Sequence, residues 1–253
     1  MLLVIDVGNS NITFGVWKDD NLIGPWRLKT RPLQTSDQYG LFITEILNRN
    51  DLEDIIGVII SSVVPDVMHS FVNSIRKYLF IDPLIVGPGI KTGISIRTEN
   101  PKEVGADRIV NSVAASILYD LPAIVIDFGT ATSFDIINEN SEFIGAVTAP
   151  GMQVSANAMY ESAAQLPNVQ IATPNSVVAK STTQSMQAGI VFGQVGSVEY
   201  IVKKICDELD WSKVKIIATG GLGRLIAQES GLINVYDANL TLRGLKLIYY
   251  KNV

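Results

Sequence analysis

The stretch LLVIDVGNSN, residues 2–11, decides the expected fold because a related stretch, AIVIDFGTAT, returns at residues 123–132. Each stretch is an apolar run followed by an acid, a glycine, and amide or hydroxyl side chains. The two acids, Asp6 and Asp127, lie 127 − 6 = 121 residues apart. Apolar runs that end in polar, glycine-containing turns are typical of β-hairpins, so the sequence predicts two copies of one hairpin.

The polar turn in each copy has the chemistry of a phosphate site. A glycine lets the backbone approach an anion closely. Backbone N–H groups, together with hydroxyl or amide side chains, can then surround a phosphate. An acid beside a phosphate is repulsive unless a cation lies between them, so Asp6 and Asp127 also indicate metal ions. Two such hairpins facing each other across a cleft would make a nucleotide site.

Composition indicates a globular protein of one large domain or two ordinary ones, and the repeat favours two. Of the 253 residues, 47% are hydrophobic and 18% are charged, which fits a substantial core. The net charge of −5 argues against nucleic acid as a partner. Cys206 is the only cysteine, which excludes an internal disulfide and fits a reducing compartment. No signal peptide or membrane-spanning run is apparent, so we expect a cytoplasmic protein without a membrane partner.

Hydrophobic periodicity predicts an α/β fold in which three strands, and then alternating helices and strands, occur twice. The pair Ile23-Gly24 matches Ile144-Gly145 at the 121-residue spacing, which extends the repeat over a whole hairpin. We place the domain boundary at the helix expected over residues 105–119, which gives domains 1–117 and 118–253. The other expected strands are residues 2–7, 12–17, 22–28, 57–64, 84–86, 123–128, 133–138, 142–148 and 214–218. The other expected helices are residues 36–48, 65–79, 152–166, 183–209, 225–229 and 240–250.

A series of ordered motifs resembles the type III pantothenate kinases along nearly the whole chain. The most family-specific block is NPKEVGADR at residues 100–108. The remaining motifs are DVGNSN at 6–11, WRL at 26–28 with Thr30, TSDQY at 35–39, DFGTAT at 127–132, PG at 150–151, SMQAG at 185–189 and TGG at 219–221.

This resemblance implies the fold of the acetate and sugar kinase, Hsp70 and actin superfamily: two ribonuclease H-like domains with an ATP cleft between them. It implies ATP-dependent phosphorylation of pantothenate to 4′-phosphopantothenate, the first step of coenzyme A biosynthesis. It also implies Mg²⁺, a monovalent cation such as K⁺ or NH₄⁺, and a homodimer with the substrate site at its interface.

The resemblance assigns roles to individual residues. Asp6 would orient Mg²⁺ through water, Asp127 would bind the monovalent cation, and Asp107 would be the general base. The residues implied in ATP binding are Asp6, Val7, Gly8, Asn9, Ser10, Asn11, Ile12, Thr13, Thr130, Gly220 and Gly221, with Thr132 as a further candidate. The residues implied in substrate binding are Gly105, Ala106, Asp107, Arg108 and Thr182.

Residue spacing alone leaves two interpretations of Asp107. Acids favour the first turn of a helix because of its dipole, whereas a carboxylate beside the attacking hydroxyl can accept its proton. The resemblance favours catalysis. Arg108 could contact the substrate or hold Asp107 in place. Asn111, one turn further on, could share the face of Asp107 or lie on a solvated surface.

Two positions depart from the family pattern, and a third role has two candidate residues. The chain offers Thr183 as a rival to Thr182 for the substrate contact from a partner subunit. Thr98 stands where many relatives carry tyrosine, so an aromatic wall of the pantothenate pocket is missing or supplied elsewhere. Gln38 stands where relatives often carry glutamate, at a helix start where we expect it to affect capping.

Other functions stay open on these residues. The ATP motifs do not select the acceptor, so a kinase for another small metabolite is an alternative, as is a non-catalytic nucleotide-binding regulator. A filament or a chaperone is less consistent with a chain this short. The sequence lacks the G-x-x-x-x-G-K-[ST] motif of P-loop kinases. The sequence has one histidine, His69, and offers no Ser-His-Asp candidates for a hydrolase triad.

Overall fold

The computed structural model describes residues 1–253, which form two compact units. Residues 1–94, 99–114 and 240–253 make the first unit, and residues 95–98 and 115–239 make the second. Each unit holds a mixed β-sheet with its own helices, so the α/β class is confirmed. No helix combines the length and the hydropathy that crossing a membrane requires.

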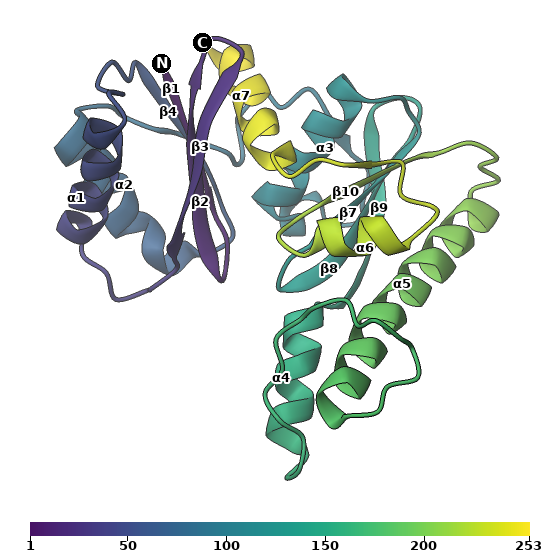
Figure 1. The fold of residues 1–253 in the computed structure, drawn as a ribbon. Coiled ribbons are helices and arrows are strands. Elements are labelled where there is room, and N and C mark those ends of the chain that lie inside the picture. The colour runs from purple at the N-terminus through teal and green to yellow at the C-terminus, as the bar shows by residue number, and fades with distance from the viewer. The chain divides into compact units, whose positions relative to one another are not determined.

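The first unit is built on a five-stranded sheet (Figure 1). Its strands are β1 (Leu2–Val7), β2 (Asn11–Lys18), β3 (Asn21–Lys29), β4 (Gly57–Ser62) and β5 (Leu84–Ile85). Its helices are α1 (Ser36–Arg49), α2 (Pro65–Leu79), α7 (Leu240–Asn252) and the larger part of α3 (Ala106–Leu118), which follows the short 3₁₀ turn Pro101–Glu103. The strand order is β3-β2-β1-β4-β5, with β1 antiparallel to β2 and parallel to β4.

The central strand β1 is buried on both faces because helices cover both. Successive side chains of a strand point to opposite faces. Leu3 and Ile5 pack in the cluster formed with α1 and α2, whereas Leu2 and Val4 pack in the cluster formed with α7 and the start of α3. By the same alternation Asp6 points to the face of Leu2 and Val4, which places this acid on the α3 and α7 side of the sheet.

Local sequence signals explain where α1 and α2 begin. Thr35 caps α1, since its hydroxyl accepts a hydrogen bond from the Gln38 backbone N–H, 3.3 Å away. The Gln38 side-chain oxygen accepts in turn from the Thr35 backbone N–H at 2.9 Å, which completes a capping box. The expected capping role of Gln38 is therefore confirmed. Pro65 occupies the first turn of α2, where its missing N–H costs nothing.

The second unit is built on a six-stranded sheet. Its strands are β6 (Ser95–Ile96), β7 (Ala123–Phe128), β8 (Ala131–Ile137), β9 (Glu142–Pro150), β10 (Lys215–Thr219) and β11 (Val235–Tyr236). Its helices are α4 (Met152–Ser162), α5 (Thr182–Glu208) and α6 (Gly223–Glu229). Ile124, Ile126 and Phe128 pack with residues of α5 such as Val191 and Val198 in the core of this unit.

The two sheets confirm the duplication. The order in the second is β11-β10-β7-β8-β9-β6, so β9-β8-β7-β10-β11 reproduces β3-β2-β1-β4-β5 and only β6 is added. The strands β1 and β7 also have the same sequence of buried positions, with the acid as the one half-buried residue. Both halves therefore have the expected ribonuclease H-like order of elements.

Several expected boundaries differ from the structure. The helix expected over residues 152–166 ends at Ser162, and the following residues to 180 form no helix or strand. The two-residue strand β11 is too short to show a hydrophobic period, and it was not expected. The expected division at residue 117 also differs from the observed grouping, which assigns residues 240–253 to the first unit. The reason is that Leu242, Leu245 and Ile248 of α7 pack against the first sheet, not against the second.

A close crossing of α3 and α7 gives the first prediction. A Cβ added at Gly244 in α7 would overlap the carbonyl oxygen of Val110 in α3. We expect Gly244→Ala to lower the free energy of unfolding by about 1–3 kcal/mol, as overpacked core sites do. Urea unfolding of Gly193→Ala is the control, because a Cβ at this α5 position meets nothing within 4 Å. Equal stability of the two variants would contradict the close packing.

Candidate functional site

The first polar turn connects β1 to β2 through residues 8–11. The strands pair up to Val7 and Ile12, and the Gly8 N–H donates to the Asn11 carbonyl oxygen at 3.0 Å. Both Val7 and Ile12 are buried, so only their backbone atoms could reach a ligand. Thr13 is half-buried and lies opposite Asp6 in the pairing. The side chains of Asn9, Ser10 and Asn11 are exposed.

Thr30 ties this turn to the end of β3. Its hydroxyl donates to the Gly8 carbonyl oxygen at 2.7 Å, and its backbone N–H donates to the Ser10 carbonyl oxygen at 3.1 Å. The family motif drew attention to Thr30, but no contact with the turn could be predicted from it. The pairing of β2 with β3 creates this contact.

Asp6 receives a hydrogen bond from a residue that sequence reasoning missed. The hydroxyl of Ser61 in β4 donates to Oδ1 of Asp6 at 2.7 Å, and Ser61 is fully buried. Asp6 and Ser61 lie side by side in the parallel pairing of β1 with β4. This bond uses one of the roughly four acceptor positions of a carboxylate and fixes its plane. Only the register of two strands 55 residues apart could have indicated Ser61.

Removing the Ser61 hydroxyl tests its support of Asp6. If Asp6 acts through bound Mg²⁺, Ser61→Ala should raise the KM for MgATP by about 10-fold, as outer-shell metal partners do. Ser74→Ala is the matched control, because the fully buried Ser74 hydroxyl donates to the Phe71 carbonyl oxygen at 2.6 Å in α2. Both variants should lose about 1 kcal/mol of stability. An unchanged KM in Ser61→Ala would show that the bond only supports the fold.

The second polar turn, between β7 and β8, is one residue shorter than the first. The strands pair up to Phe128 and Thr132, and the Gly129 N–H donates to the Ala131 carbonyl oxygen at 3.1 Å. Gly129 and Thr130 are exposed, as a ligand contact requires. Thr132 is buried, and its hydroxyl has no hydrogen-bond partner in the structure.

The structure brings Asp127 and Gly220 together. Strand β10 runs parallel to β7 with Thr219 opposite Asp127, and Gly220 follows at once. Gly220 has φ +88°, and a Cβ there would lie 2.5 Å from Oδ1 of Asp127. The Tyr236 hydroxyl donates to the Gly220 carbonyl oxygen at 3.0 Å, while Gly221 is exposed. Only glycine fits at residue 220 without displacing the carboxylate.

Asp107 lies in the first turn of α3, as expected. Gly105 precedes the helix, Ala106 begins it, and all residues from Gly105 to Arg108 are half-buried. The Arg108 backbone N–H donates to Oδ1 of Asp107 at 2.8 Å. Burial raises the pKa of Asp107 above its ordinary value, and this N–H and the Arg108 charge offset only part of the effect. A raised carboxyl pKa suits a general base, because proton transfer is most efficient when the pKa lies near the working pH.

Asn111 is not on a solvated surface. It is 1% exposed, and its side-chain oxygen accepts a hydrogen bond from the Thr241 hydroxyl at 2.7 Å. Helical spacing alone allowed Asn111 to face solvent. In the structure α7 covers this side chain, and no local sequence pattern could indicate the position of α7. The solvated interpretation of Asn111 is therefore wrong.

Thr182 and Thr183 are both exposed at the start of α5. Ser181 caps this helix by accepting from the Gln184 backbone N–H at 3.3 Å, so neither threonine is needed as the cap. The choice between them stays a prediction. Thr98 lies just after β6, and its hydroxyl is buried without a hydrogen-bond partner.

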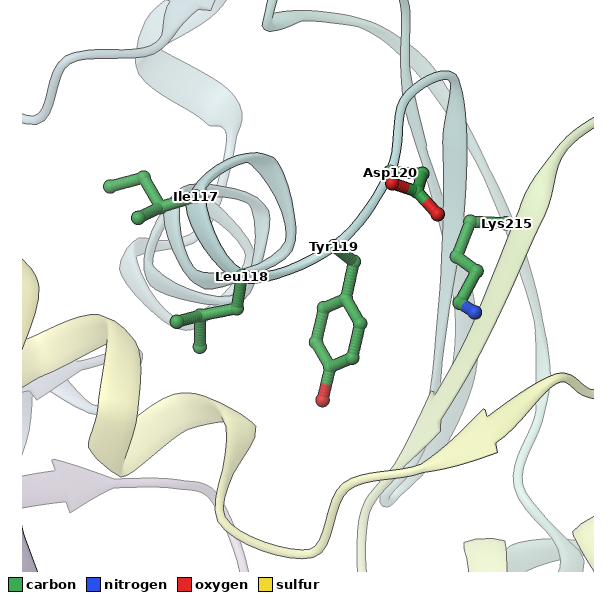
Figure 2. A pocket seen from close by; sticks show the side chains of 5 residues that line it. All are labelled: Ile117, Leu118, Tyr119, Asp120 and Lys215. Atoms are coloured by element: carbon green, nitrogen blue, oxygen red, sulfur yellow. The ribbon is translucent and has the colours of Figure 1, made fainter.

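The protein side chains form no metal site of their own, since no group of three or more His, Cys, Asp or Glu could hold an ion. A pocket of about 370 Å³ lies between the end of α3 and the start of β10, and Figure 2 shows the side chains that line it. It contains none of the expected site residues; Tyr119, which lines it, donates to Oδ2 of Asp237 at 2.8 Å.

Known proteins resemble this chain over nearly its whole length. A family model described as type III pantothenate kinase matches residues 2–204. A type III pantothenate kinase of Agathobacter rectalis is 49% identical over 99% of this chain and 97% of its own. Another, from Halalkalibacterium halodurans, is 50% identical over 100% of both chains. Among solved structures, a Baf family protein of Campylobacter jejuni has a TM-score of 0.63 at 21% identity, over 99% of this chain and 98% of its own.

Proposed function

Because this chain belongs to the type III pantothenate kinase family and phosphorylates pantothenate in coenzyme A biosynthesis, we propose that Asp107 is the general base of that reaction. The observation that supports this role most directly is the half-buried Asp107 carboxyl with its raised pKa, in the block that matches the family. Gly105, Ala106 and Arg108 surround it in sequence and would contact pantothenate.

Residues of each polar turn are proposed to bind ATP. In the first unit, the residues from Asp6 to Thr13 would bind phosphates mainly through backbone N–H groups, since Val7 and Ile12 have buried side chains. In the second unit, Thr130, Gly220 and Gly221 would contact ATP. The exposure of both turns and of Gly221 supports this assignment.

Phosphoryl transfer demands mainly alignment and charge stabilisation from the protein. The terminal hydroxyl oxygen of pantothenate forms a bond to the γ-phosphorus as the bond to the ADP oxygen breaks. Asp107 accepts the hydroxyl proton, which leaves the transferred phosphate on pantothenate and releases ADP. Arg108 lies next to Asp107 and its positive charge would favour the anionic substrate.

The residues fit the cations that the family implies. Asp6 would orient Mg²⁺ through water, with Ser61 fixing its carboxylate. Asp127 would bind K⁺ or NH₄⁺, with its carboxylate placed against the Gly220 backbone. Bound cations would offset the negative charge of ATP beside these two acids.

A homodimer is part of the proposal, with Thr182 reaching the substrate of the partner subunit. Exposed apolar side chains occur on α4 and on the loop that leads into α5, and burial against a second copy would remove them from water. They are Val154, Met159, Tyr160, Val177 and Val178. Thr182 follows this loop directly and is exposed. A cytoplasmic location, where ATP is available, completes the proposal.

The decisive experiment measures phosphate transfer from ATP to pantothenate with K⁺ present and then replaced by Na⁺. Product that forms only with K⁺ or NH₄⁺ supports the cation site at Asp127, and Asp127→Asn should remove the difference. Equal rates in both salts would contradict the cation site.

Sedimentation of the wild type and of Tyr160→Glu tests the dimer. A discrete wild-type dimer that Tyr160→Glu weakens supports an interface on α4, and a monomeric wild type contradicts the dimer.

A further inference from the structure

Thr30 and Gly151 occupy the same position in the two repeats. Their spacing, 151 − 30 = 121, equals the spacing of Asp6 and Asp127. Thr30 follows β3, which ends at Lys29, and Gly151 follows the equivalent strand β9, which ends at Pro150. Each residue lies against the carbonyl oxygens of the polar turn in its own unit.

In the first turn, Thr30 holds two carbonyl groups. Its hydroxyl binds the Gly8 carbonyl oxygen, and its backbone N–H binds the Ser10 carbonyl oxygen. In a planar trans peptide, the C=O and the N–H of the next residue point in opposite directions. The N–H groups of Asn9 and Asn11 therefore point away from Thr30. Backbone N–H groups that share one direction form an anion-binding concavity.

In the second turn, the backbone of Gly151 packs directly against two carbonyl groups. A Cβ on Gly151 would lie 2.6 Å from the Gly129 carbonyl oxygen and would overlap that of Thr130. The same peptide geometry directs the N–H groups of Thr130 and Ala131 away from Gly151. Both residues are exposed, so these N–H groups lie at the surface of the second unit.

The two turns need different residues because they differ in length. The first has four residues between its paired ends, Val7 and Ile12, and the second has three, between Phe128 and Thr132. At the longer turn a threonine side chain spans the distance to a carbonyl oxygen. At the shorter turn the backbone at residue 151 already touches both carbonyl groups, and no side chain fits.

We propose that Thr30 and Gly151 are positioning residues that orient the two turns so that their N–H groups bind the phosphates of ATP. The proposal rests on the nucleotide role of the turns proposed above and extends it to two residues outside them. Neither residue needs to touch the ligand. Each one acts on the carbonyl side of the turn, and the N–H side binds phosphate.

The first test compares Thr30→Val, Thr30→Ser and Thr44→Val in the whole protein. Thr44 is the matched control, because its hydroxyl donates to the Gly40 carbonyl oxygen at 2.9 Å within α1. Calorimetry measures the Kd for MgADP and for adenosine. Thr30→Val should weaken MgADP about 10-fold, from one lost hydrogen bond and a looser turn, and leave adenosine unchanged. Thr30→Ser and Thr44→Val should behave as wild type.

The second test compares Gly151→Ala with Gly145→Ala, whose added Cβ meets nothing within 4 Å. Only Gly151→Ala should lose phosphate-dependent affinity: its Kd for MgADP should rise at least 10-fold more than its Kd for adenosine. Thermal unfolding shows whether each variant is folded.

Equal losses of affinity for MgADP and adenosine would overturn the proposal, as would unchanged affinities in either Thr30→Val or Gly151→Ala. If Asp6→Asn weakens MgADP while Thr30→Val and Gly151→Ala do not, the nucleotide role stands and the positioning role fails. A wild type that binds no MgADP would overturn both.

Discussion

Asp107→Asn is expected to lower kcat about 10²–10⁴-fold, the usual contribution of a positioned general base. The amide keeps the size of the carboxyl and can still accept the Arg108 backbone N–H, so the start of α3 should be unchanged. The KM values for ATP and pantothenate should change much less than kcat, because the lost proton acceptor matters mainly in the transition state. Near-normal turnover in Asp107→Asn would exclude the general base.

The same substitution should not cost stability at neutral pH. Burial raises the folded-state pKa of Asp107 above its unfolded value, so the folded protein binds more protons than the unfolded chain between these two pKa values. The contribution of Asp107 to stability is therefore full at low pH and falls as the pH rises through the folded-state pKa. The amide in the Asp107→Asn variant carries no charge and avoids this loss.

Urea unfolding at several pH values measures this effect. The wild type should lose stability relative to Asp107→Asn as the pH rises through the raised pKa, and the two should differ least in acid. In the wild type, kcat should rise over the same pH range as the base becomes ionised. A variant that is clearly less stable than wild type at pH 7 would argue that the Asp107 charge supports the helix instead.

Gly220→Ala is expected to remove most of the ATP affinity, with a rise in KM of more than about 10-fold. Alanine at φ +88° is strained. Its Cβ would also lie 2.5 Å from the Asp127 carboxylate and 2.7 Å from the Phe128 backbone. Relieving these overlaps must move the end of β10 away from β7, which separates the residues proposed for the nucleotide and the monovalent cation.

The control for Gly220→Ala is its neighbour, Gly221→Ala. Gly221 has no positive φ, and a Cβ there meets nothing within 4 Å. Calorimetry with MgATP and urea unfolding should show a loss of affinity, and about 1–3 kcal/mol of stability, only in Gly220→Ala. Similar affinities in both variants would mean that the nucleotide does not depend on the contact between Gly220 and Asp127.

Periodicity and turn chemistry predicted most of the elements because both are local. The strands β1 and β7 and the helix α2 begin and end at the expected residues. The capping role of Gln38 and the duplicated hairpin were also predicted, since each depends on residues that are close in the sequence. Hydrophobic periodicity also predicted Asp107 near the start of a helix, which the structure confirms.

What the sequence could not indicate depends on contacts between distant segments. Ser61 reaches Asp6 only through the register of two strands, and Asn111 is buried only because α7 covers it. The role of Thr30 likewise requires the pairing of β2 with β3. No hydrophobic period distinguishes a helix that packs on its own repeat from one that packs on the other, so the destination of α7 was not predictable.

The return of α7 to the first unit has a consequence for synthesis on the ribosome. The strands β1 to β5 precede the second unit in the chain, but the face with Leu2, Val4 and Ile59 is covered by α7, which follows the second unit. Every element of the second unit is made in between. The first unit therefore cannot complete this core until the whole second unit has been synthesised, because Leu242, Leu245 and Ile248 become available only after that.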